Sequence, residues 1–68
     1  MSTNRPVKVL LKFHSDTNFA LFVEQLDFFI PGNLYEADYA KAQVKVFTDV
    51  EIDQALRLAS DLGATVYE

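Results

Sequence analysis

Two short stretches of the chain carry the side chains that could do chemistry. In the first, His14, Ser15 and Asp16 stand together directly after an alternating apolar segment. Histidine is the commonest general base and serine is a common nucleophile, but catalysis needs both, with an orienting group, to converge in space. Here the three residues are only neighbours in the chain, and Ser15 also suits a helix N-cap. We therefore expect no catalytic residues and a protein that is not an enzyme.

The second stretch is acidic. Asp49, Glu51 and Asp53 alternate with other residues at the start of a predicted helix. The glycine and the terminal glutamate of a calcium loop are absent, and acidic residues at this place favour the helix dipole without any ligand. The chain has no cysteine and a single histidine, which excludes thiolate and multi-histidine metal sites. We expect neither a metal nor a cofactor.

The composition describes one small domain, residues 1–68, with few means of stabilising itself. Half of its residues are hydrophobic, and they include six phenylalanines and three tyrosines. A chain of this length buries only about 60% of its surface on folding. Small domains often gain stability from a disulfide, a metal or a second subunit. Since the first two are excluded, a homodimer is the remaining way to add stability.

The net charge limits the classes of partner, and the N-terminal residues indicate the cellular compartment. The net charge is −4, which disfavours nucleic acids and anionic membranes as partners because both attract basic surfaces. The chain has no signal-peptide core and no apolar run of the roughly 18 residues that a membrane span needs. We expect a small acidic protein of the cytoplasm, with residues 1–5 forming a disordered N-terminus.

The apolar pattern predicts two strands and two helices outside the middle of the chain. Residues 7–13 alternate as a half-buried strand does, and residues 64–68 form a second short strand. A first helix begins in the polar segment after His14 and runs to about Ile30, where Pro31-Gly32 ends it. A second helix follows the sequence TDVE, which fits a capping box, and ends before Gly63. The core side of the first helix is predicted to hold Phe19, Phe22, Val23, Leu26, Phe29 and Ile30.

The middle of the chain allows two interpretations. Residues 36–42 have adequate helix propensity. A hairpin with a two-residue turn at Ala40-Lys41 instead sets Glu36 opposite Lys45, which is a favourable cross-strand pair. Its other side is then entirely apolar or tyrosine, which a wrong register would rarely achieve. That side pairs Tyr39 with Ala42, Ala37 with Val44 and Tyr35 with Val46. The register favours the hairpin.

The resulting order of elements is βαββαβ. Two βαβ halves joined by a hairpin indicate an α+β fold, the ferredoxin-like sandwich. It has a four-stranded antiparallel sheet of order 4-1-3-2 with two helices on one face. The other face of the sheet is open.

Two groups of apolar residues are predicted to point away from the core. Stepping 100° per residue around the first helix places Leu21 and Phe28 opposite its core side. The open sheet face supplies the second group, which we expect to form one row: Leu10, Leu34, Phe47 and Tyr67. Single exposed apolar residues are common on surfaces, but an apolar patch with a charged rim is typical of interfaces. We predict that the protein binds its partner through one of these two apolar surfaces, and the sequence leaves the choice between them open.

Families of this architecture can be distinguished by their motifs. An RNA-recognition sheet needs an aromatic and basic signature on its third strand, and AQVKVFTD supplies only Phe47. Metallochaperones need Cys-x-x-Cys, which is absent. The ending ALRLASDLGATVYE is similar to that of amino-acid-sensing ACT domains, although FHSDTNF stands where their glycine-bearing first loop would be. This resemblance implies an alternative function, a small-molecule-sensing regulatory module with its ligand near residues 14–18 of a dimer.

The sequence as a whole favours a non-enzymatic protein-protein interaction module. It would bind a protein partner or a second copy of itself through an exposed apolar patch. Small inhibitors and adaptors made by phages and mobile elements are often of this kind. Binding of single-stranded nucleic acid is a third hypothesis, which the acidic net charge disfavours.

Overall fold

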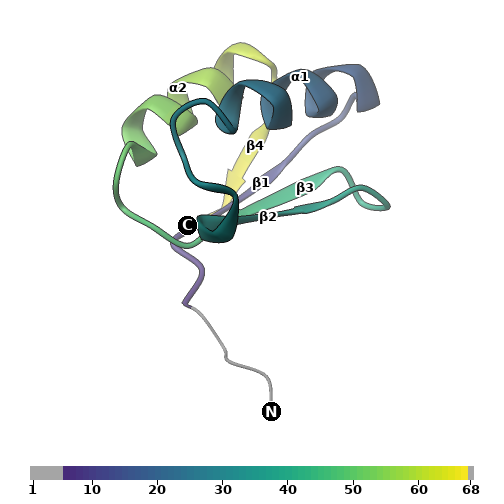
Figure 1. The fold of residues 1–68 in the computed structure, drawn as a ribbon. Helices are drawn as coiled ribbons and strands as arrows, with labels where there is room; N and C mark the ends of the chain where they lie inside the picture. The colour runs from purple at the N-terminus through teal and green to yellow at the C-terminus, as the bar shows by residue number, and fades with distance from the viewer. Residues whose placement is uncertain (1–5, 68) are drawn as a thin grey trace.

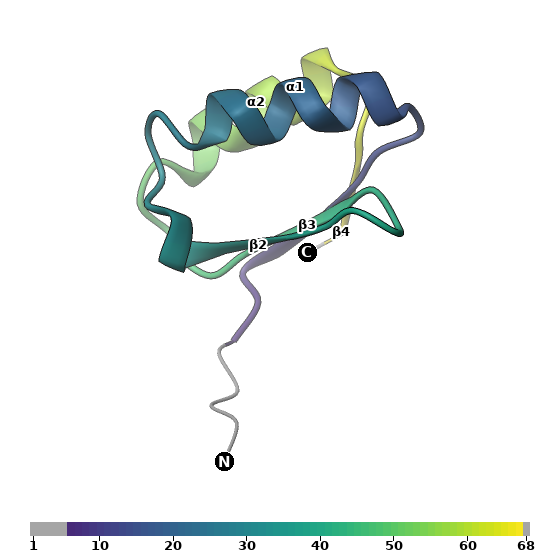
Figure 2. The same ribbon diagram turned by 45° about the vertical axis from the view of Figure 1, so that its right-hand side comes forward.

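The protein is an α+β domain in two layers. A computed structural model describes residues 6–67, so the prediction for residues 1–5 lies outside the described part of the chain. The elements are β1 (Val9–Lys12), α1 (Asp16–Leu26), a 3₁₀ helix η1 (Gly32–Leu34), β2 (Tyr35–Asp38), β3 (Gln43–Val46), α2 (Ile52–Asp61) and β4 (Thr65–Tyr67). The four strands form one antiparallel sheet, and both helices lie on the same face of it (Figure 1). Within residues 6–67, no helix or strand covers the other face (Figure 2).

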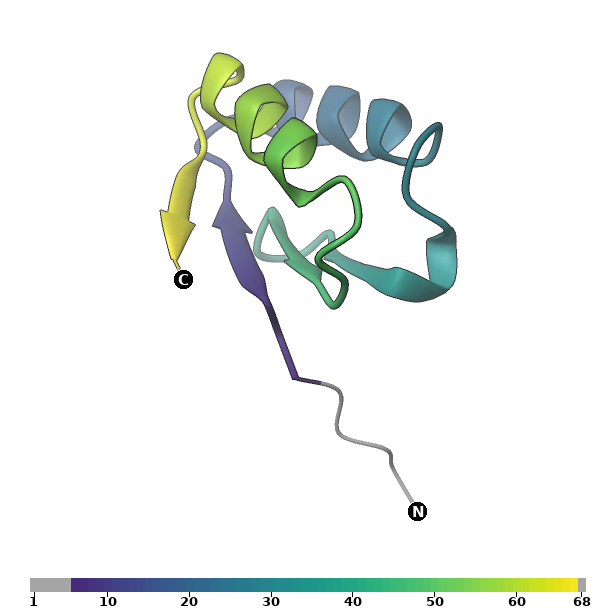
Figure 3. The ribbon, with the colours of Figure 1, turned by 90° about the vertical axis from the view of Figure 1, so that its left-hand side faces the viewer.

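The sheet has the strand order β2-β3-β1-β4, which reads 4-1-3-2 from the β4 edge. β1 lies in the middle and pairs with β3 on one side and with β4 on the other (Figure 3). β2 forms the opposite edge and pairs with β3 alone. The first and the last strand along the chain, β1 and β4, are therefore neighbours in the sheet.

The predicted register of the β2-β3 hairpin is confirmed. Tyr35 pairs with Val46 and Glu36 with Lys45, as the sorting of apolar and charged side chains required. The prediction of a two-residue turn is wrong, because the strands stop at Asp38 and Gln43 and leave a loop of residues 39–42. The Asp38 carboxylate accepts hydrogen bonds from the backbone N–H groups of residues 40 and 41, at 3.1 and 3.2 Å. Such a side-chain cap stabilises a wider turn than the strands alone would form.

Helix α1 begins as predicted and ends early. The Ser15 side chain caps it by accepting a hydrogen bond from the Asn18 N–H at 3.3 Å. The helix stops at Leu26, and the chain continues to Ile30 through tight turns that still use the last helical carbonyls. The predicted core side is confirmed, since four of its residues are buried and Val23 and Phe29 pack against the core from half-buried positions.

The predicted capping box at the start of α2 is wrong. Glu51 is itself the N-cap, its side chain makes no capping hydrogen bond, and its φ of 61° is left-handed. The Thr48 hydroxyl accepts a hydrogen bond from Val50 N–H at 3.1 Å instead of bonding to residue 51. A capping box needs its glutamate in the first helical turn, where φ is negative. With a left-handed φ, Glu51 cannot form the reciprocal side-chain hydrogen bonds with Thr48. At the other end, Gly63 takes the positive φ of 76° that its position after the helix predicted.

Replacing Glu51 with glycine is expected to raise the free energy of unfolding by up to about 1 kcal/mol, because a left-handed φ strains any residue with a Cβ. The matched control is Asp53→Gly in the first turn of α2, which should lower it by roughly 0.5–1 kcal/mol. Urea unfolding followed by circular dichroism measures both. A fall of similar size in both variants would contradict a left-handed Glu51.

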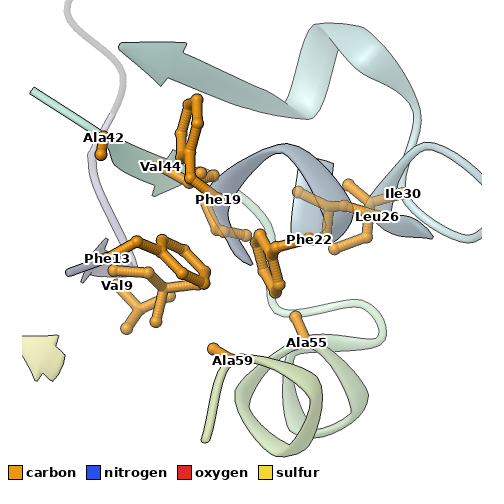
Figure 4. Close-up of a cluster of buried hydrophobic side chains, with 12 residues drawn as sticks. Val9, Phe13, Phe19, Phe22, Leu26, Ile30, Ala42, Val44, Ala55 and Ala59 are labelled. Carbon is orange, nitrogen blue, oxygen red and sulfur yellow. The ribbon is translucent and has the colours of Figure 1, made fainter. Parts of the chain in front are cut away.

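The core is one apolar cluster enclosed between the sheet and the helices (Figure 4). The Phe13 ring packs against Phe22 with a centroid distance of 4.9 Å. α2 contributes Ala55 and Ala59, both fully buried, whose small side chains point toward this ring pair in Figure 4. No polar or charged residue is buried among those described. The strand predicted over residues 7–13 is shorter in the structure, because β1 spans only Val9–Lys12. Val7 lies before β1 and is 46% exposed.

Candidate interaction surfaces

The strand register defines which side chains occupy the open face of the sheet. Directly opposed residues of antiparallel strands point to the same side. Val9 and Leu11 are buried beneath the helices, so Leu10 and Lys12 point to the open face. One row across that face is Tyr67, Leu10, Lys45 and Glu36. The neighbouring row is Thr65, Lys12, Gln43 and Asp38.

The apolar side chains of this face run diagonally across it. Tyr67 stands opposite Leu10 and is 50% exposed, while Leu10 and Phe47 are half-buried. Phe47 follows Lys45 by two residues, which makes it a diagonal neighbour of Leu10 at a distance that aromatic side chains span. The predicted single row is therefore wrong, because the register inserts Lys45 beside Leu10. We call Leu10, Phe47 and Tyr67 the sheet patch.

Leu34 does not belong to the sheet patch. It lies in η1, where the backbone is helical rather than extended, and its half-buried side chain packs against the core. Its carbonyl accepts a hydrogen bond from Phe47 N–H at 2.9 Å. The two-residue alternation that placed Leu34 on the open face applies only to extended backbone. The prediction of an outward-facing Leu34 is therefore wrong.

Three lysines surround the sheet patch. Lys8 Nζ lies 3.5 Å from Asp49 Oδ2, an exposed ion pair of the kind that contributes about 1 kcal/mol at most. Lys12 and Lys45 are exposed and form no ion pair with any residue in 6–67. The carboxylates of this face, Glu36 and Asp38, lie on the edge strand β2. The two central strands are therefore basic next to the apolar side chains.

The second predicted group lies on α1 and in the turn that follows it. Leu21 is 42% exposed and Phe28 is 84% exposed, so both point away from the core as expected. Phe28 lies just past the helix, and its N–H donates to the Gln25 carbonyl at 3.1 Å. The Tyr35 hydroxyl donates to Asp27 Oδ1 at 3.2 Å and ties this turn to β2. A phenylalanine so exposed has little role in packing, which makes it the runner-up contact.

Burial, together with the hydrogen bond to the negatively charged Asp27, raises the pKa of the Tyr35 phenol above its ordinary value of 10. Because the unfolded chain then releases this proton first, the associated stability is complete below about pH 10 and is lost as pH rises through the folded-state pKa. We expect Tyr35→Phe to lose thermal stability less steeply than the wild type above pH 10. Asp27→Asn should change the profile in the same direction but less, since burial remains. Coincident wild-type and Tyr35→Phe melting profiles from pH 8 to 11 would contradict this.

Three polar residues after β1, namely His14, Ser15 and Asn18, form hydrogen bonds within the domain. His14 Nε2 shares a hydrogen bond of 2.8 Å with Thr65 Oγ1 and so joins the end of β1 to the start of β4. The Asn18 side-chain amide donates to the Leu62 carbonyl at 3.0 Å and joins the start of α1 to the end of α2. Together with the Ser15 cap of α1, these bonds link β1 to β4 and α1 to α2. The segment proposed for a small-molecule ligand is thus used by internal hydrogen bonds.

The acidic start of α2 borders a shallow surface hollow. Its lining residues are Asp49, Glu51, Ile52, Asp53, Gln54 and Arg57. Among residues 6–67, no group of three or more histidine, aspartate or glutamate side chains is placed to hold a metal ion. The hollow is open and carries both signs of charge, so nothing in it selects a ligand.

The fold and its surfaces define a small two-layer α+β domain with one uncovered sheet face. In the described part, neither helix has the length and apolar character needed to cross a membrane. Comparison of the chain with protein-family models, curated proteins and solved structures finds no match. The exposed surfaces of the domain are therefore the main evidence for its function.

Proposed function

We propose that this protein is a non-enzymatic protein-binding module that docks its partner on the open face of the sheet. One observation carries the proposal. Both helices cover the same face of the sheet (Figure 2), and the strand register places the sheet patch on the uncovered face. Aromatic and aliphatic side chains within a charged rim are the usual composition of protein interfaces.

The architecture supports this proposal. The element order is βαββαβ, and both helices lie on one side of the antiparallel sheet. This order supports the ferredoxin-like sandwich, which we propose as the fold type. In such a two-layer fold, the helices and one sheet face enclose the core. Within the described part of the chain, the other sheet face is left uncovered and available to a partner.

Within this proposal, the protein acts in the cytoplasm as a small inhibitor or adaptor of the phage or mobile-element type. Its partner is another protein or a second copy of the same chain. The engagement of Ser15 and Asn18 in internal hydrogen bonds supports binding rather than catalysis. The same bonds give no support to the alternative, an ACT-like small-molecule sensor, because they use the groups that would hold its ligand.

The test is to remove the sheet patch without unfolding the domain. Tagged wild type, Leu10→Asp and Phe28→Asp are isolated under native conditions from the cells that make them, and the mass of each assembly is measured by size exclusion with light scattering. We expect the wild type and Phe28→Asp to be part of an assembly, and Leu10→Asp to be a folded monomer. An intact Leu10→Asp assembly, or loss of the assembly in Phe28→Asp alone, would contradict the proposal.

A further inference from the structure

We infer that the open sheet face accepts an acidic partner, namely an apolar protein segment that carries carboxylates. The inference rests on the proposed function and adds the chemistry of the partner. It comes from the way in which the fold divides the charges of the chain between its two layers.

The helix layer is acidic. No lysine or arginine occurs between Lys12 and Lys41, so α1 carries only acids, Asp16 and Glu24. In α2, two aspartates stand against a single basic residue, Arg57. Much of the negative charge behind the formal net charge of −4 therefore lies in the helix layer, away from the sheet patch.

The central strands have the opposite character. β1 and β3 have the sequences VLLK and QVKV, with no carboxylate in either. Lys45 stands directly opposite Leu10, and Lys12 follows Leu10 by two residues on the same face. Two ammonium groups therefore stand on two sides of one apolar side chain. Within residues 6–67 neither forms an ion pair, although Glu36 is the cross-strand neighbour of Lys45 on the edge strand β2.

This arrangement selects a ligand with both apolar groups and carboxylates. Lysine stems can extend the apolar surface around Leu10 while their ammonium groups reach outward. A partner carboxylate that meets them forms a charge-assisted hydrogen bond at the edge of a water-excluding contact. A basic partner would instead meet two unpaired like charges, which costs affinity.

A single-stranded nucleic acid is also an anion, but the fold favours it less. The acidic helix layer would repel its phosphates while the lysines attract them. The net charge of the domain, −4, also disfavours binding of a polyanion. Stacking of bases needs open aromatic faces. Here Phe47 is half-buried and Tyr67 lies at the edge of the sheet.

The test uses a displayed library of random short peptides selected on the immobilised wild-type protein. We expect the selected peptides to be rich in Asp and Glu together with large apolar residues. A synthetic copy of the commonest peptide should bind the Lys12→Gln/Lys45→Gln double variant about tenfold more weakly, since two charge-assisted contacts are lost. Lys41→Gln, an exposed lysine in the hairpin loop, is the matched control and should bind like the wild type.

The outcomes separate this inference from the proposed function. Peptides that need Leu10 but lack acidic residues, or that bind the double variant as tightly as the wild type, overturn the inference and leave the docking face in place. Selection of no peptide, or of peptides that bind Leu10→Asp unchanged, overturns both. An oligo(U) RNA that binds at low salt and is lost in the double variant makes nucleic acid the occupant and also overturns the inference.

Discussion

Replacing Phe22 with alanine is expected to lower the free energy of unfolding by about 3–5 kcal/mol, the usual cost of deleting a buried phenylalanine ring. Phe22 is fully buried and lies where α1, α2 and the sheet meet (Figure 4). Domains of this length have a total stability of roughly 3–10 kcal/mol. The variant should therefore be partly or fully unfolded at room temperature, as measured by urea titration with far-ultraviolet circular dichroism.

The same deletion at Phe28 is the control for this prediction. Phe28 is 84% exposed, and we expect Phe28→Ala to change the stability by no more than about 0.5 kcal/mol, as exposed positions usually do. The two variants remove identical atoms six residues apart, so the difference between them measures burial alone. Equal losses of stability would mean that Phe28 is packed in solution and is no candidate contact.

Aspartate at Leu11 is expected to prevent folding, while aspartate at the adjacent Leu10 should leave the domain folded. Leu11 is fully buried, and an unpaired carboxylate there costs several kcal/mol, on the order of the whole stability of the domain. At Leu10 the new carboxylate points to the open face and stands opposite Lys45. We therefore expect a stability loss of about 1 kcal/mol or less for a half-buried leucine replaced beside a lysine.

Thermal unfolding of both variants measures this difference. The same measurement shows whether Leu10→Asp is folded, which the binding test requires. A Leu10→Asp chain as unfolded as Leu11→Asp would show that both faces of β1 are core, and the open face of the sheet would then be covered in solution.

The sequence was sufficient where side-chain periodicity alone decides the structure. The hairpin register followed from the sorting of Glu36 opposite Lys45 and of Ala37 opposite Val44, which a wrong register would rarely achieve. The exposure of Phe28 followed in the same way from helical spacing, because three consecutive apolar residues cannot all face one side. Both rest on local patterns that need no knowledge of distant contacts.

The errors lie where the backbone leaves these patterns. Glu51 adopts a left-handed conformation that the neighbouring residue types do not predict. The sequence TDVE therefore matched a capping box that the structure does not form. Leu34 turns inward because η1 is a 3₁₀ helix, which interrupts the alternation expected of a strand. In each case the backbone departs from the regular helix or strand geometry on which the prediction depended.

The candidate site needed the relative placement of separate strands. The hairpin fixes β2 against β3, but the alignment of β1 with β3 is set only when the core is assembled. That alignment puts Lys45 beside Leu10 and makes the patch diagonal. The basic character of the central strands was likewise hidden in a net charge of −4, because it appears only when β1 and β3 become neighbours.

Site-specific photocrosslinking in the producing cells tests the central claim most directly. A photoreactive residue is placed at position 45 on the open sheet face, or at position 57 on the outer side of α2. The side chains of Lys45 and Arg57 are both exposed. We predict a discrete protein crosslink from position 45 that disappears in Leu10→Asp, and none from position 57. A crosslink from position 57 with none from position 45 would contradict the assignment of the open sheet face as the docking surface.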